Sequence, residues 1–226
     1  MSMSPRQPVE EVADGAEVAP ASASRRRFVR NVGLGAAALG AVAVTGTSLA
    51  GVASAQSEGE GSELDPADVA LVQFLQSVSL AAEKGLTLAG DATYLEPELR
   101  EEVRIYARHH ANHAETLGGL LTEEELITDP NARLLDEISG QVSGSADQAV
   151  LLDVLLGFEQ SVAATLLAGV GEAGSWRVSE TIATLQPIVA QQAAALGSAN
   201  GVAIDEWLPT FATTDGALAP NAYPAR

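Results

Sequence analysis

Two histidines and one glutamate have the types and the spacing that could bind a metal ion. His110 and His113 are three residues apart, so on a helix their imidazoles lie about one turn apart on the same face. His109 could replace or support one of them, and Glu159 offers a carboxylate from a separate apolar segment. Such a set suits zinc, copper or ferrous iron. Two interpretations stay open: one bound Zn, Cu or Fe ion, or a polar layer without metal in which the histidines bond to Glu159 or to backbone groups.

Four long helices are predicted to position these side chains, because apolar residues recur every three or four positions along four segments. The predicted helices cover residues 65–89, 96–117, 147–170 and 176–196, and a short helix or turn precedes residues 140–145. No alternating strand pattern is present. The stripes therefore predict an all-α fold, an antiparallel four-helix bundle over residues 65–197.

Polar residues interrupt the middle of the apolar stripes. They are Ser79, His110, His113, Glu159 and Gln192. An unpaired polar group in a bundle core costs about 1–3 kcal/mol. We therefore expect these side chains to bond one another, water or a metal.

The stripe residues resemble those of the ferritin-like superfamily, particularly an exported bacterial branch related to desiccation-associated proteins. The similarity covers about residues 66–197 and rests on Val72 to Leu75, on His110 to His113 with Leu117, on Phe158 with Glu159, and on Val189 to Gln192 with Leu196. Members with a di-iron centre use one Glu from each of two helices and a Glu-x-x-His pair from each of the other two. The resemblance implies that Ser79, His110 with His113, Glu159, and Val189 with Gln192 occupy those positions. Of the expected ligands only Glu159 and His113 are present, so di-iron chemistry is not expected.

The first 55 residues have the layout of a twin-arginine signal peptide. Arg25 and Arg26 precede a weakly apolar segment at about residues 32–52, and small residues predict cleavage after Ala55. We expect export by the twin-arginine pathway to the cell envelope or the extracellular medium. No later stretch is expected to span a membrane after cleavage, and the alternative is an uncleaved membrane helix.

The two ends of the exported chain differ in composition. Residues 56–64 are rich in Ser, Gly and Glu and are predicted to form a disordered leader. Residues 198–226 contain Trp207, Phe211 and Tyr223, which predict a C-terminal tail packed along the bundle. The alternative is that these aromatic residues dock a protein partner.

The charge and composition of the chain argue against several kinds of partner and site. The chain has 12 Lys and Arg against 30 Asp and Glu, a net charge of −18 that repels nucleic acid and anionic membranes. It has no cysteine, which excludes disulfides and thiolate sites. We expect a non-catalytic structural or binding protein of the cell envelope, which could form a homodimer. The alternative is a single-metal-binding protein or metalloenzyme that uses His110, His113 and Glu159.

Overall fold

The computed structural model describes residues 64–207 and 213–225. The predicted signal peptide, its cleavage site at Ala55 and most of the predicted leader lie outside this part of the chain. The helices are α2 (Pro66–Gly90), α3 (Pro97–Gly118), α4 (Ala132–Gly144), α5 (Gln148–Glu172), α6 (Trp176–Asn200) and the short α7 (Ile204–Trp207). The residues that the structure describes contain no strand, so the prediction of an all-α fold is confirmed.

Side chains at the helix starts satisfy backbone N–H groups that have no partner within the helix. Asp65 caps α2 by accepting from the N–H groups of Ala67 and Asp68, and Pro66 occupies the first helical position. Asp147 caps α5, and Ser175 caps α6. These caps fix where each long helix begins.

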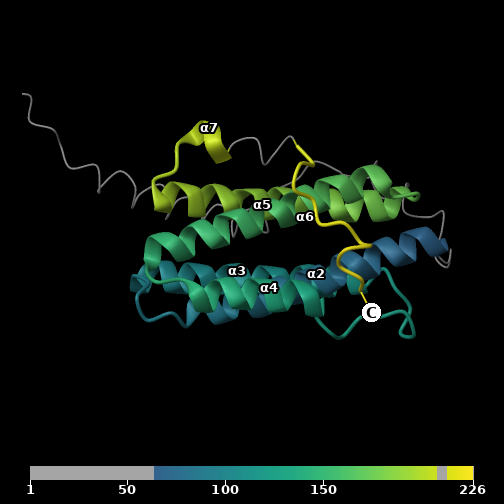
Figure 1. The fold of residues 1–226 in the computed structure, drawn as a ribbon. Coiled ribbons are helices and arrows are strands. Elements are labelled where there is room, and N and C mark those ends of the chain that lie inside the picture. Colours follow the sequence, from purple (N-terminus) through teal and green to yellow (C-terminus); the bar gives the residue numbers. More distant parts are fainter. Residues whose placement is uncertain (1–63, 208–212, 226) are drawn as a thin grey trace, which may run out of the picture.

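The four long helices form two antiparallel hairpins, which lie as two layers in Figure 1. In the first hairpin, Gln76 near the middle of α2 donates to the backbone oxygen of Ala114 near the end of α3, at 3.3 Å. In the second, Ser179 near the start of α6 donates to the backbone oxygen of Val170 near the end of α5, at 3.1 Å. The layers meet through buried apolar side chains such as Leu75, which lies against Gly169.

Helix α4 connects the two hairpins. It runs parallel to α2, since the N–H of Asn131 donates to the oxygen of Ser77 at its start and Ile138 packs on Gly85 further along. The chain thereby returns to the end of the bundle where α3 began, and α5 consequently runs parallel to α3. The sequence analysis expected only a short helix or turn here. The helix is 13 residues long because Leu134, Ile138 and Val142 form a buried stripe of their own.

Helix α5 is long and apolar enough to cross a membrane by length and composition, whereas no segment after the predicted signal peptide was expected to be so. Most of its apolar window is buried against the other helices. Glu159 lies near its middle and is fully buried. A core helix of a helical protein has the same pattern.

The end of the chain lies against the helices. Helix α6 extends to Asn200, beyond the predicted end of the bundle at residue 197, and Gly201 stops it in the left-handed conformation (φ 75°) that glycine favours. The tail then crosses from the layer of α5 and α6 to α4 (Figure 1). Leu218 and Tyr223 in this tail pack against the core.

Candidate functional site

A fully buried pair of polar side chains lies in the middle of the core. His110 on α3 and Glu159 on α5 are both 0% exposed. The Nε2 atom of His110 is 3.2 Å from each carboxylate oxygen of Glu159. With Glu159 in its carboxylate form, which only accepts hydrogen bonds, Nε2 carries the proton and donates to both oxygens. The pair therefore ties α3 to α5, while the Nδ1 atom of His110 is buried without a hydrogen-bond partner.

His113 lies one turn further along α3, beside His110. The two ring centroids are 5.4 Å apart and the planes are inclined at 74°, an edge-to-face contact. Burial, together with the smaller effects of the charges of His110 and His109, lowers the pKa of His113 to about 3. The imidazole is consequently neutral near pH 7. Its Nδ1 atom is buried and has no hydrogen-bond partner.

A second polar pair joins α3 to α6. The amide Nε2 of Gln192 lies 2.8 Å from Nδ1 of His109, so the amide donates and the imidazole accepts. Burial lowers the pKa of His109, and the neighbouring His110 and Arg108 act in the same direction. The expected polar layer is therefore divided: His110 pairs with Glu159, and His109 pairs with Gln192.

Two other positions of the expected ligand set do not contribute to this layer. The hydroxyl of Ser79 donates to the backbone oxygen of Leu75 at 2.9 Å, within its own helix. Val189 is fully buried and apolar.

One polar pair was not anticipated. The hydroxyl of Tyr106 donates to Glu102, four residues earlier on α3. Burial raises the pKa of Tyr106 well above its usual value, and Glu102 and then Glu159 raise it further. Burial also raises the pKa of Glu102. The spacing of four residues between a glutamate and a stripe tyrosine was the signal that could have revealed this pair.

No protein-family model, characterised protein or solved structure matches this chain. The ferritin-like resemblance therefore rests on the residue pattern of the sequence and stays a prediction.

The structure shows how the predicted metal ligands His110, His113, Glu159 and His109 are bonded. Glu159 uses both oxygens on Nε2 of His110, and His109 is bonded to Gln192. In the described part of the chain, no group of three or more His, Asp or Glu side chains is placed to hold one ion. The residues therefore do not fit the three-ligand set His110, His113 and Glu159 as arranged here. Among the atoms of these four residues, the Nδ1 atoms of His110 and His113 are buried without a hydrogen-bond partner.

Proposed function

We propose that this chain is an exported, ferritin-like four-helix bundle that acts as a non-catalytic structural or binding protein of the cell envelope. The observation that carries the proposal is the bonding of Glu159. It is the only carboxylate that the resemblance leaves in the core, and both its oxygens accept from His110. A bridged metal centre needs several carboxylates to balance its charge, whereas here a single carboxylate is paired with one imidazole.

The path of the chain supports the ferritin-like part of this proposal. Two antiparallel hairpins are joined by a connection that returns along the bundle, so the second and third long helices run parallel. Ferritin-like bundles are distinguished from simple up-and-down bundles by one such crossover. Here α4 lies within the crossover and covers α2.

The export part of the proposal rests on Arg25, Arg26 and the small residues that end at Ala55. The double substitution Arg25→Lys, Arg26→Lys keeps the charge and removes the paired arginines. We expect the precursor to accumulate inside the cell, while a control with Arg30→Lys is still exported and cleaved. Fractionation and mass spectrometry of the N-terminus measure both effects, and equal export of the two variants would contradict a twin-arginine signal.

The second candidate function is a single-metal-binding protein. The observation in its favour is that the Nδ1 atoms of His110 and His113 are both buried without partners, on rings in contact. These two nitrogens would hold a Zn, Cu or Fe ion. Glu159 would then orient His110 through its other nitrogen, as carboxylates commonly do for metal-bound histidines.

Elemental analysis separates the two functions. The protein should be purified after export with its own signal peptide, without chelator or affinity metal. The structural proposal predicts far less than one equivalent of any transition metal and an unchanged melting temperature on adding Zn²⁺, Cu²⁺ or Fe²⁺. About one equivalent that disappears in the His110→Leu, His113→Leu variant would instead establish the metal-binding function.

A further inference from the structure

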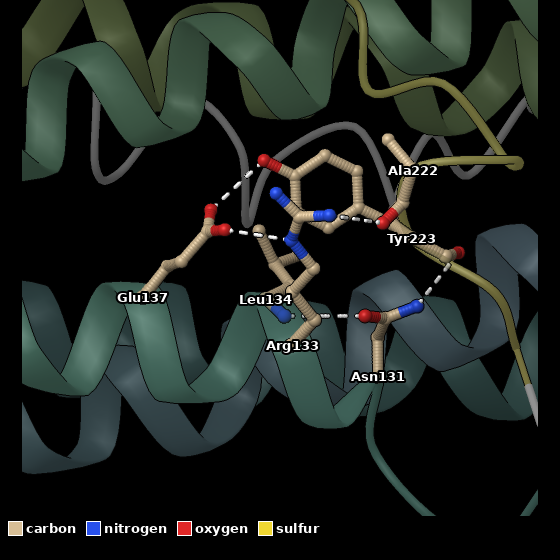
Figure 2. Close-up of polar contacts among 6 residues, drawn as sticks. All are labelled: Asn131, Arg133, Leu134, Glu137, Ala222 and Tyr223. Carbon is tan, nitrogen blue, oxygen red and sulfur yellow. Dashed lines mark hydrogen bonds and ion pairs between the residues drawn. The ribbon is translucent and has the colours of Figure 1, made fainter.

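Asn131, the N-cap of α4, and Arg133 on α4 bond three consecutive peptide groups of the C-terminal tail, two of which Figure 2 shows. Arg133 donates to the oxygen of Ala222 at 3.0 Å. The amide of Asn131 donates to the oxygens of Tyr223 and Pro224, at 3.0 and 3.1 Å. Three successive carbonyl groups are thus held by side chains, at the end of a turn in which the N–H groups of Ala222 and Tyr223 donate to the oxygen of Ala219.

The same face of α4 also contacts the side chain of Tyr223. The tyrosine hydroxyl donates to Glu137 at 2.8 Å, and the guanidinium carbon of Arg133 lies 5.1 Å from the centroid of the ring. Arg133 itself donates to Glu137 at 2.9 Å. Figure 2 shows this arrangement, in which the guanidinium of Arg133 faces the ring and the carboxylate of Glu137 accepts from the hydroxyl. The face therefore discriminates tyrosine from smaller side chains at this position.

Groups outside the tail hold this face in place. Asn131 is 1% exposed; its side-chain oxygen caps α4 by accepting from Leu134, and its N–H donates to Ser77 on α2. Arg133 and Glu137 are four residues apart on one helix and pair with each other. These bonds would persist without the tail, so the binding face is preorganised.

The tail is bonded to the helices mainly near its end. Among the described residues, those at 213–217 make local bonds, from Asp215 to Thr213 and from Ala217 to Thr214. The next bond goes to the body of the protein, from the N–H of Leu218 to the hydroxyl of Thr165 at 2.8 Å. Nearer α6, Ile204 is 63% exposed. The tail can therefore leave its site without unfolding a long helix.

We propose that the face of α4 formed by Asn131, Arg133 and Glu137 is a peptide-binding site that also accepts the tail of a second copy of this chain. Every contact is made to tail groups that each copy carries, so an exchange between two copies preserves all of them. At low concentration the copy's own tail occupies the site because its effective concentration is high. At high local concentration the exchange gives a homodimer. This inference concerns the surface and does not depend on whether the core binds metal.

The first test uses a fluorescent peptide of residues 213–226 and the full exported chain with Leu218→Ser and Tyr223→Ala, which weaken its own tail. Anisotropy should show saturable binding of the peptide. Adding Arg133→Ala to this chain should weaken binding by at least about tenfold, whereas Arg108→Ala, which removes an exposed arginine elsewhere, should not. A peptide that carries Tyr223→Ala should also bind at least about tenfold more weakly. Circular dichroism verifies that each chain is folded. If the Arg133→Ala chain does not fold, Glu137→Gln takes its place in the comparison.

The second test is complementation. The chain with Leu218→Ser and Tyr223→Ala retains the binding face formed by Asn131, Arg133 and Glu137. A chain with Arg133→Ala has a weakened binding face but retains an intact tail. Native mass spectrometry of the mixture should show a heterodimer at concentrations where neither chain alone dimerises. Failure of the peptide to bind the folded chain at about millimolar concentration, or binding unaffected by Arg133→Ala, would overturn the peptide site. Peptide binding without any heterodimer would overturn the exchange between copies.

Discussion

Replacing both members of the buried pair should be far less harmful than replacing either one. In the Glu159→Met variant the Nε2 donor of His110 would be left without a partner at a position with no exposure to solvent. Removing one member of a buried polar pair costs about 3–5 kcal/mol, whereas replacing both by apolar groups of similar size is often neutral. The single variants Glu159→Met and His110→Leu should therefore each lose about 3 kcal/mol, and the double variant should lie within about 1 kcal/mol of the wild type.

Urea unfolding of the purified protein in the presence of a chelator measures these differences in the free energy of unfolding. In a domain of this size a loss of 1 kcal/mol lowers the melting temperature by about 2–4 °C, so each single variant should melt roughly 6–12 °C lower. Glu172→Met, on the exposed end of the same helix, serves as the control and should change the stability by no more than about 0.5 kcal/mol. If the double variant loses as much as the two single variants together, the pair does not stabilise itself and the reasoning is refuted.

Three further predictions follow from the described contacts. Because burial lowers the pKa of His113 to about 3, the unfolded chain takes up a proton at this site before the folded chain does. This contribution to stability is complete above the unfolded pKa near 6.5 and falls by up to about 1.4 kcal/mol per pH unit as the pH drops toward 3. As the pH falls from 6.5 to 4, the wild type should therefore lose this stability and the His113→Leu variant should not. Urea titrations at several pH values measure the difference in unfolding free energy between the two; a difference that does not change with pH would show that His113 titrates normally. Asp68 is buried and accepts from the N–H groups of Gly174 and Ser175 at 2.7 and 2.8 Å, so Asp68→Ala should cost about 3 kcal/mol in a urea melt. Asp65→Ala, which removes only a helix cap, should cost about 1 kcal/mol, and equal losses would contradict the buried role of Asp68. A Cβ added at Gly85 would lie 2.8 Å from Ile138, so Gly85→Ala should destabilise by about 1–3 kcal/mol. Gly157 has open space around it, so Gly157→Ala should stabilise by up to about 1 kcal/mol; the same sign for both substitutions in thermal melts would contradict the packing.

Apolar periodicity was enough to predict the long helices because each buries one stripe over many turns. It was less informative for α4, where only three buried residues and two glycines lie within 13 residues. The spatial neighbours of the stripe residues could not be derived in the same way. Whether His109 or His113 meets Gln192 depends on the rotation and depth of α3 against α6, and a sequence period of three or four does not determine either.

In the candidate site, too, the sequence predicted which residues are buried but not which side chains bond to one another. The sequence placed His110 and Glu159 in the core, but the hydrogen bond that Ser79 makes within its own helix required coordinates. The bond from Tyr106 to Glu102 was not predicted, although their spacing of four residues indicates it. The binding face of α4 was not predicted from the sequence at all. A helix-capping asparagine such as Asn131 followed by an arginine and a glutamate four residues apart is also the ordinary composition of a solvated helix surface.

The protonation and bonding of the core imidazoles test the central claim most directly. Long-range ¹⁵N–¹H NMR of the exported chain, labelled with ¹⁵N-histidine, reports the proton on each ring nitrogen. We predict that His110 carries its proton on Nε2, that His113 stays neutral down to about pH 3, and that Zn²⁺ leaves the Nδ1 signals of both residues unchanged. A shift of both Nδ1 signals at one equivalent of Zn²⁺ would contradict a polar core without metal and establish that these histidines bind a metal.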